Sequence, residues 1–395
     1  MTLPEVFVVS AARTAIGTFG GSLKEVPLGD LATTAVRAAI ERSGAPIDAV
    51  GHLAMGNVIP TEPRDAYLSR VAAMQAGLPQ EVPAFNVNRL CGSGLQAIVS
   101  AAQSILLEDT DIAIGGGAES MSRSPYLAQG ARWGARMGDM QMVDYMSNIL
   151  HDPFHRIHMG MTAENVAQAY GITREQMDAL AAESHRRAAA AIAAGYFKAQ
   201  VVPVMLKSRK GEVAFDTDEH VKPDTTVATL AAMKPAFKKE GGTVTPGNAS
   251  GINDGAAAVV LASAQAVRTH GLRPLARLVA YAHAGVDPKI MGIGPVPATR
   301  KVLARAGLKV QDLDVIESNE AFAAQACAVT QQLELDPARV NPNGSGISLG
   351  HPVGATGAII TTKALYELQR VGGRYALVTM CIGGGQGIAA IFERA

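Results

Sequence analysis

Asn86-Val-Asn-Arg-Leu-Cys91-Gly-Ser-Gly-Leu-Gln-Ala97 places a cysteine where a short apolar strand gives way to a helix of small residues. Glycines at positions 92 and 94 would let backbone N–H groups point at a substrate. Unpaired donors at a helix start favour negative charge, so we expect a lowered pKa for this thiol. The stretch therefore predicts a thiolate nucleophile beside an oxyanion site, although a buried structural cysteine would also fit beside these glycines.

Two distant stretches carry possible partner groups. Asn341-Pro-Asn-Gly-Ser-Gly-Ile-Ser-Leu-Gly-His351 places a histidine before another helix-like run, and Thr379-Met-Cys381-Ile-Gly383 ends an apolar strand with a second cysteine. Asn319-Glu-Ala-Phe322 adds an amide that can position a water molecule. Together these stretches supply the nucleophile, base, second acid/base and water-positioning group that acyl transfer through a thioester requires.

The N-terminal part of the chain alternates strand-like and helix-like runs. The predicted strands cover 6–9, 84–87 and 111–117, the last running into a glycine turn at Gly115-Gly-Gly. The predicted helices cover 31–42, 68–76 and 94–107. This alternation predicts a mainly parallel sheet with helices on its faces.

The second half repeats the order of the first. The helix-like run 299–306 and the segment after it repeat the pattern of 34–42, and Gly383-Gly-Gly mirrors Gly115-Gly-Gly. We infer two copies of one βα unit whose helix-opening loops face a shared site. Cys91 then comes from one copy, and His351 and Cys381 from the other.

An insertion between the copies, about 120–250, breaks the alternation. It contains two alanine-rich helical stretches, 163–170 and 174–194, and the second begins with Thr173 and Gln176 at capping-box spacing. Basic residues gather in its later part, where they form either a solvated surface or a phosphate-binding one: Lys207, Arg209, Lys210, Lys222, Lys234, Lys238 and Lys239.

Composition excludes several classes of protein. The 395 residues carry 35 basic and 35 acidic side chains, so the net charge of zero does not favour nucleic acid or a membrane surface. Three cysteines form no disulfide framework, and Cys327 is most simply a packed helix position. No signal peptide is evident, so we expect a cytoplasmic protein.

Three histidines, His151, His155 and His158, lie close together in the sequence. No thiol or carboxylate pattern accompanies them, so no metal site is predicted.

Taken together, these motifs resemble those of the thiolase family, the acyl-CoA C-acetyltransferases that make or cleave 3-ketoacyl-CoA. The resemblance extends through Arg13-Thr-Ala-Ile-Gly-Thr-Phe-Gly-Gly, Gly115-Gly-Gly-Ala-Glu-Ser-Met-Ser and Gly247-Asn-Ala-Ser-Gly-Ile-Asn-Asp-Gly. It implies a duplicated, five-layered αβαβα fold. The N-terminal half is then 1–120 completed by 251–272, the C-terminal half is 273–395, and 121–250 is a loop domain that holds coenzyme A.

The resemblance also implies roles for individual residues. Cys91 would be the nucleophile, His351 its base, Cys381 the second acid/base and Asn319 the water-positioning group, with the N–H groups of Cys91 and Gly383 holding an oxyanion. Lys222 stands where short-chain members usually have arginine, which leaves at best a point-charge contact with phosphate. The implied coenzyme A and acyl contacts are Leu150, His158, Met159, Lys222, Phe237, Ser250, Met291 and Phe322.

The chain looks closest to the bacterial broad-specificity short-chain β-ketothiolases, which condense acetyl-CoA with acetyl-CoA or propionyl-CoA reversibly. Coenzyme A is then substrate and product, and no cofactor is expected. The resemblance also implies a homotetramer built from two dimers, with the region around Trp133 at their contact. The resemblance implies a role in polyhydroxyalkanoate synthesis or fatty acid metabolism.

Four alternatives remain at this point. A degradative longer-chain 3-ketoacyl-CoA thiolase would share every catalytic residue. A decarboxylating ketoacyl synthase would typically place a histidine where this chain has Cys381. A cysteine protease would need neither Cys381 nor the duplicated order, and a non-catalytic acyl-CoA-binding protein would require an inert Cys91.

Overall fold

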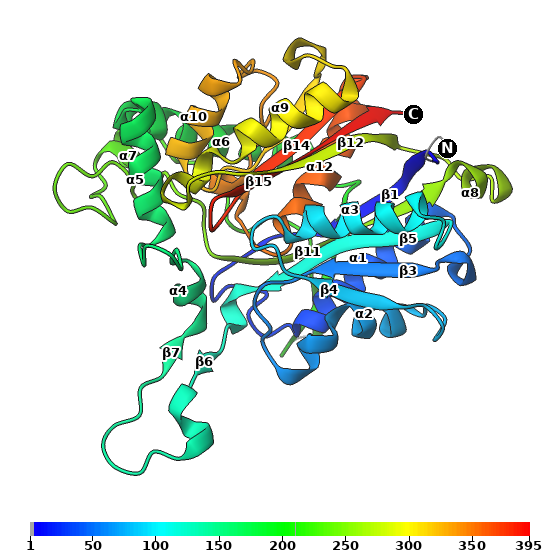
Figure 1. Cartoon of the computed structure of the whole chain (residues 1–395), viewed down its shortest axis with the longest axis horizontal. Coiled ribbons are helices and arrows are strands. Elements are labelled where there is room, and N and C mark those ends of the chain that lie inside the picture. Colours follow the sequence, from blue (N-terminus) through cyan, green and yellow to red (C-terminus); the bar gives the residue numbers. More distant parts are fainter. Residues whose placement is uncertain (1–3, 210) are drawn as a thin grey trace.

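The computed structural model describes residues 4–209 and 211–395, so the predicted basic residue Lys210 lies outside the described residues. Its main sheet has the strand order β13-β14-β15-β12-β1-β11-β5-β3-β4, with β2 and β8 attached to its side (Figure 1). The strands of this sheet are β1 (Val6–Thr14), β2 (Gly17–Thr18), β3 (His52–Gly56), β4 (Ala84–Val87), β5 (Ile112–Ser120), β8 (Val201–Val202), β11 (Asn253–Ser263), β12 (Ala276–Gly285), β13 (Val315–Ser318), β14 (Tyr375–Ile382) and β15 (Gln386–Arg394).

Helices form three layers around this sheet. The first layer packs on the outer face of the N-terminal half-sheet, the second lies between the half-sheets, and the third covers the C-terminal half-sheet (Figure 1). The expected five-layered αβαβα arrangement is confirmed. In order, the layers contain α1 (Leu28–Ser43) and α2 (Leu68–Ala76), then α3 (Ser93–Leu106) and α12 (Thr356–Val371), then α9 (Pro295–Ala306) and α10 (Ala323–Gln332), while the short α8 (Ala264–Thr269) and α11 (Gly346–Leu349) lie in connections.

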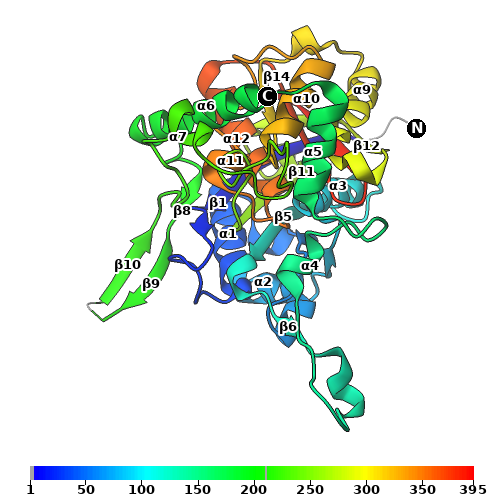
Figure 2. The same ribbon diagram turned by 90° about the vertical axis from the view of Figure 1, so that its left-hand side faces the viewer.

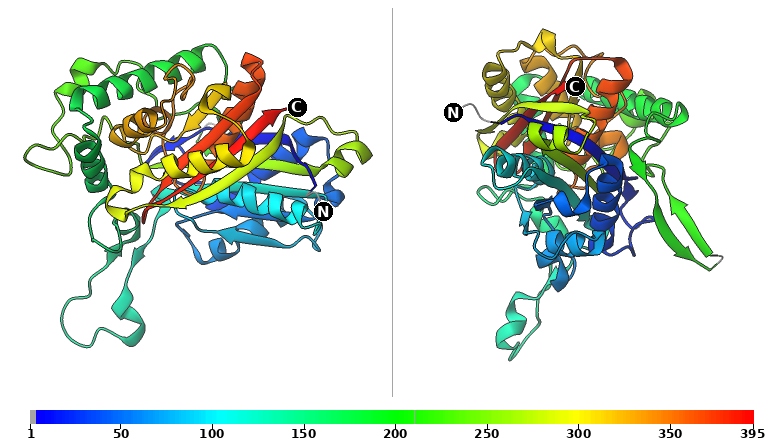
Figure 3. Two further views of the ribbon diagram at one scale, coloured as in Figure 1. Left: turned by 45° about the horizontal axis from the view of Figure 1, so that its top comes forward. Right: turned by 90° about the vertical axis from the view of Figure 1, so that its right-hand side faces the viewer.

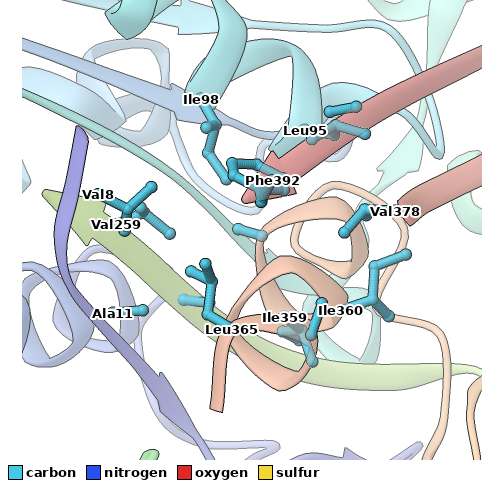
Figure 4. Close-up of a cluster of buried hydrophobic side chains, with 14 of the residues drawn as sticks. Val8, Ala11, Leu95, Ile98, Val259, Ile359, Ile360, Leu365, Val378 and Phe392 are labelled. Carbon is cyan, nitrogen blue, oxygen red and sulfur yellow. The ribbon is translucent and has the colours of Figure 1, made fainter. Parts of the chain in front are cut away.

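The central layer is the hydrophobic core that joins the two halves. Figure 4 shows apolar side chains of α3 and α12 between those of the two half-sheets. Because both faces of this layer are covered, its helices are apolar on more than one side. The labelled residues are Leu95 and Ile98 of α3, Ile359, Ile360 and Leu365 of α12, Val8, Ala11 and Val259 of the N-terminal half, and Val378 and Phe392 of the C-terminal half.

The two half-sheets have the same internal order, which confirms the inferred duplication. β1-β11-β5-β3 corresponds to β12-β15-β14-β13, and the parallel bridge Ile316↔Val340 stands where β4 pairs with β3. A short antiparallel ladder, Phe7↔Arg277 and Val8↔Ala276, joins the halves edge to edge.

Two elements of the N-terminal half have the bounds that the sequence predicted. The helix predicted at 68–76 is α2, and the strand predicted at 84–87 is β4.

The prediction of a mainly parallel sheet is wrong. Among the described strands, the parallel pairs are β3 with β4 and β5, β13 with β14, and the two-residue β8 with β1. β1, β11, β12 and β15 form antiparallel ladders. β15 shows the reason, because it follows β14 through the tight Gly383–Gly385 turn, and a hairpin can only be antiparallel.

The proposed equivalence of Gly115-Gly-Gly and Gly383-Gly-Gly is also wrong. The first triplet lies within β5, where it pairs with β3 and β11, and is no turn. A Cβ on Gly115 would clash with the backbone of Ile98, and one on Gly117 with the carbonyl oxygen of Gly354. These glycines therefore allow α3 and the segment after His351 to pack directly on β5.

The segment between β5 and β11 forms an outer group of helices and two projecting arms (Figure 2). The capping box that opens α6 is confirmed, since Thr173 N donates to Gln176 Oε1 at 2.8 Å and Gln176 N to Thr173 Oγ1 at 3.3 Å. Trp133, on the first arm, is 87% exposed. The elements are β6 (Tyr126–Leu127), β7 (Val143–Asp144), α4 (Tyr145–Ile149), α5 (Met159–Tyr170), α6 (Arg174–Ala193), β9 (Val204–Ser208), β10 (Gly211–Phe215) and α7 (Val227–Ala231).

Arg13 anchors this segment to the core. Its guanidinium is fully buried and donates to both carboxylate oxygens of Asp218, at 2.7 and 2.9 Å, and to Gln200 at 2.7 Å. Arginine is suited to this bidentate contact, because its planar guanidinium matches the two oxygens of a carboxylate.

Figure 3 shows the helices of the segment between β5 and β11 on one side of the layered body. In the described part of the chain, no helix is both long and apolar enough to cross a membrane.

Candidate active site

Loops from both halves meet around a cavity of about 410 Å³. Cys91, between β4 and α3, forms part of its wall, as do His351 before α12 and Gly383 after β14. A second cavity, of about 480 Å³, lies between α6 and α10 and contains Cys327. Burial raises the pKa of Cys327 to about 12, which agrees with the predicted packing role and keeps this thiol protonated.

Helices α3 and α12 bring the Cys91 and His351 loops together. A Cβ on Gly94 would lie 2.7 Å from the backbone nitrogen of Ala358, and one on Gly357 would clash with the backbone of Leu95. Leu90, just before the cysteine, has the unusual φ of 46°. The glycines at these helix starts therefore serve the close approach of two helices, and the turn at Leu90 presents Cys91 to the cavity.

Cys91 is half-buried, and the backbone N–H groups of Gly383 and of Cys91 itself lie near its sulfur. Burial raises the pKa of this thiol, the two N–H groups oppose the rise, and the charge of Glu119 adds to it. The expectation of a lowered pKa is therefore wrong, because the loss of water around the sulfur outweighs the donors. The resting group is a neutral thiol that needs a base.

His351 can be that base. Its Nδ1 lies 2.6 Å from Thr356 Oγ1, whose own proton goes to Pro352 O at 2.9 Å. Nδ1 is therefore the protonated nitrogen, so Nε2 carries the lone pair that can accept a proton, and Asn319 Nδ2 lies 3.4 Å from it. Burial lowers the pKa of His351 to about 4, so the ring is neutral at neutral pH.

Cys381 and Asn319 lie directly behind the cavity wall. Cys381, in β14, has no exposed surface and packs with Met159, Met291 and Ala321. Burial and the neighbouring Cys91 raise the pKa of Cys381. Asn319 is also fully buried, and its Oδ1 has no hydrogen-bond partner among the residues that the structure describes.

The structure places the residues predicted to contact the acyl group and coenzyme A around one cavity, with the exception of Lys222. Lys222 lies outside the cavity wall that the described residues form, and its backbone N–H donates to His185 Nδ1 at 3.2 Å. The ring of His158 stacks on that of Phe237, with centroids 4.6 Å apart. Seven of the eight predicted contacts line the cavity: Leu150, His158, Met159, Phe237, Ser250, Met291 and Phe322.

The closely spaced histidines do not form a metal centre in the structure. The rings of His151 and His158 meet edge to face at 5.1 Å, and His151 Nδ1 bonds the carbonyl oxygen of Ser147 at 2.8 Å. Within residues 4–209 and 211–395, no group of three histidine, cysteine or acidic side chains could hold a metal ion.

Three residues with contacts to the His351 loop were missed by the sequence reasoning. Asn253 Oδ1 accepts the backbone N–H of His351 at 2.9 Å, Thr356 orients the ring, and Glu119 binds the N–H of Gly354 at 2.7 Å. Glu119 and Asn253 lie inside two of the glycine-rich motifs that carry the family resemblance, and this position was the one sequence feature that could have identified them as site residues. Their partners in the His351 loop are far away in sequence, 235 positions from Glu119 to Gly354 and 98 from Asn253 to His351.

The arrangement combines a thiol, a neutral imidazole with an unprotonated Nε2, and two backbone N–H groups near the thiol, those of Cys91 and Gly383. These are the parts needed to attack an acyl carbonyl and to stabilise the oxyanion that forms. The buried second thiol behind the wall offers a separate acid/base group. The site therefore supports acyl transfer through a cysteine.

Comparison with known proteins agrees with this chemistry. The sequence matches the family "Thiolase, N-terminal domain" over residues 6–265 and "Thiolase, C-terminal domain" over residues 272–394. Beta-ketothiolase BktB of Cupriavidus necator is 70% identical over 390 residues, which cover 99% of each chain.

Solved structures of relatives share the whole fold. Human mitochondrial 3-ketoacyl-CoA thiolase superimposes with a TM-score of 0.98 at 45% identity and covers 100% of both chains. The same human enzyme in complex with CoA gives a TM-score of 0.96 at 44% identity, covering 99% of this chain and 98% of that one.

Proposed function

The chain belongs to the thiolase family, and on that premise we propose that it is a short-chain β-ketothiolase. This acyltransferase joins two acyl-CoA molecules, acetyl-CoA with acetyl-CoA or propionyl-CoA, into 3-ketoacyl-CoA and free coenzyme A, and catalyses the reverse cleavage. The observation that carries the proposal is the meeting of Cys91, His351 and Gly383 in one cavity. The 70% identity to a β-ketothiolase over nearly the whole chain supports the short-chain substrate.

The first half-reaction transfers an acyl group to Cys91. His351 Nε2 takes the thiol proton, and the sulfur attacks the thioester carbonyl. The N–H groups of Cys91 and Gly383 hold the oxyanion, a contact worth about 3 kcal/mol per donor. When the bond to the coenzyme A sulfur breaks, the leaving thiolate takes the proton from His351, so neutral coenzyme A departs and the acyl-cysteine remains.

The second half-reaction makes the carbon–carbon bond. Cys381 passes its proton to His351, and its thiolate then removes an α-proton from a second acetyl-CoA. The imidazolium and a water bound by Asn319 hold the enolate oxygen while the carbon attacks the acyl-cysteine. Cys91 leaves as a thiolate and recovers its proton from His351. The raised pKa of Cys381 makes its thiolate a strong base once formed.

Coenzyme A and acyl-CoA are the small-molecule partners in this proposal, and no bound cofactor is needed for any step. The mainly apolar cavity wall suits pantetheine methylenes, and Ser250 can bond an amide. We further propose that 121–250 acts as the coenzyme A-binding loop domain between the halves 1–120 with 251–272 and 273–395. The homotetramer and the cytoplasmic location stay predictions.

A second candidate is a degradative longer-chain 3-ketoacyl-CoA thiolase. It is favoured by the match to human mitochondrial 3-ketoacyl-CoA thiolase over the full length of both chains. The catalytic groups would be the same, so only the acyl chain length distinguishes the two candidates. A non-catalytic acyl-CoA-binding protein would instead have an inert Cys91.

The deciding experiment is the absorbance change when coenzyme A is added to the enzyme with acetoacetyl-CoA, 3-ketovaleryl-CoA or a long-chain 3-ketoacyl-CoA. Rapid cleavage of both short substrates supports the proposal, and preference for the long chain favours the second candidate. No cleavage of any substrate would overturn the reaction. Cys327→Ser is the matched control, since this cysteine lies in the other cavity, and it should retain full activity.

A further inference from the structure

A buried carboxylate ties the two halves together beside the cavity. Glu119, in β5, is fully buried and accepts four hydrogen bonds. Its Oε1 accepts from Asn57 Nδ2 at 2.8 Å and from Ile59 N at 3.0 Å. Its Oε2 accepts from Val58 N at 3.1 Å and from Gly354 N at 2.7 Å. One side chain therefore holds two loops, one from each copy of the duplicated unit.

All four partners of Glu119 are donors, which decides its chemical form. Burial raises the pKa of Glu119 above its ordinary value, and the N–H groups of Ile59, Gly354 and Val58 oppose this rise. A protonated carboxyl would direct its O–H at a group that cannot accept it, so the hydrogen bonds select the ionised carboxylate. An amide at this position would likewise turn its NH2 group toward two donors.

Both loops that Glu119 holds carry residues of the cavity wall. Val58 lies in the first loop, and Val353 and His351 lie in the second. A Cβ on Gly354 would clash with Glu119 Oε2 and would lie 2.9 Å from the Cα of Asn57, so the second loop is pressed against this carboxylate. Asn253 holds the same loop through the N–H of His351.

We propose that Glu119 is a positioning residue of the reaction, whose carboxylate sets the place of His351 relative to Cys91 through the backbone of Gly354. The inference rests on the proposed function, in which His351 is the base for Cys91. Glu119 lies outside the cavity wall that the described residues form, so it acts through the loop it holds and not on the substrate.

The first test compares steady-state thiolysis in Glu119→Gln, which keeps the size of the side chain. We expect kcat to fall roughly 100-fold, since a displacement of about 1 Å at a catalytic group has this effect, with little change in KM for coenzyme A. The control is Asp314→Asn. Asp314 also accepts backbone N–H groups, from Arg374 at 2.6 Å and Tyr375 at 3.0 Å, but at the opposite ends of the strands, and this variant should keep its kcat.

The second test measures the rate at which iodoacetamide alkylates Cys91, followed on the Cys91 peptide by mass spectrometry. Glu119→Gln should slow alkylation when His351 is present and should have no further effect in the His351→Ala background. Equal slowing in both backgrounds, or an unchanged kcat, would overturn the inference. If Glu119→Gln does not fold, Glu119→Asp is used in the same cycle, since it keeps the charge but is one methylene too short to reach both loops.

The two proposals fail in different ways. If the proposed function is wrong, the wild-type protein cleaves no 3-ketoacyl-CoA, while the alkylation cycle can still be measured. If only the inference is wrong, the wild-type protein is active and the effects of Glu119→Gln and His351→Ala on alkylation add.

Discussion

The side-chain amide of Asn319 faces the imidazole of His351, with Nδ2 3.4 Å from Nε2. Asn319 follows β13, and His351 comes 32 positions later, in the loop before α12. The other amide atom, Oδ1, is buried and has no partner in the described part of the chain. A buried polar atom without a protein partner, beside the imidazole of His351, is a place where a water molecule can bind.

Asn319→Ala should lower the rate of condensation roughly 100-fold, because the enolate oxygen loses the water that Asn319 holds. Acylation of Cys91 uses the N–H groups of Cys91 and Gly383 and should change much less. Single-turnover labelling with radioactive acetyl-CoA measures the first step, and steady-state condensation measures both. An equal loss in the two steps would remove Asn319 from the second half-reaction.

Replacement of the two thiols should separate the half-reactions. Cys91→Ser should abolish acyl-enzyme formation, whereas Cys381→Ser should accept the acyl group and fail to condense it. The measurement is burst labelling of each variant with radioactive acetyl-CoA, followed by assay of the ketoacyl product. If Cys381→Ser takes up no label, the proposed division of roles is wrong.

Alkylation of Cys91 should keep accelerating with pH. Burial places the pKa of this thiol above its ordinary value of 9.0, so the thiolate fraction still increases beyond that pH. The rate of inactivation by iodoacetamide should therefore show no plateau below pH 9.0. Cys91→Ser supplies the background from the other two cysteines. A plateau near neutral pH would instead reveal a thiolate already present at rest.

Lys222→Ala should raise the KM for coenzyme A by up to about fivefold and leave kcat nearly intact, since an exposed charge contact contributes up to about 1 kcal/mol. Lys222 does not line the cavity that the described residues form, so its only expected contact is with the phosphates at the outer end of the substrate. Lys198→Ala, in the same insertion, is the matched control. An unchanged KM in Lys222→Ala would exclude this lysine from the site.

Local patterns were enough to predict individual elements and several reactive groups. The bounds of α2 and β4 and the capping box of α6 follow from apolar spacing and cap residues within a few positions. The predicted binding residues that line the cavity came from the family resemblance, because no local pattern connects Leu150 with Met291 or Phe322. Glu119 was missed because its importance depends on Gly354, 235 positions away in sequence.

The sequence by itself determined which chemical groups are present, where several of the helices and strands form and that the unit is duplicated, because these depend on neighbouring residues and on repeated order. Only the tertiary structure decided whether neighbouring strands are parallel or antiparallel, that the pKa of Cys91 is raised, and that Glu119 accepts a hydrogen bond from Gly354 in the His351 loop. The physical reason is that strand pairing and burial depend on segments far apart in the chain. The helix start at Cys91 would favour a thiolate, but the surrounding protein removes water from the sulfur and leaves a neutral thiol that requires His351.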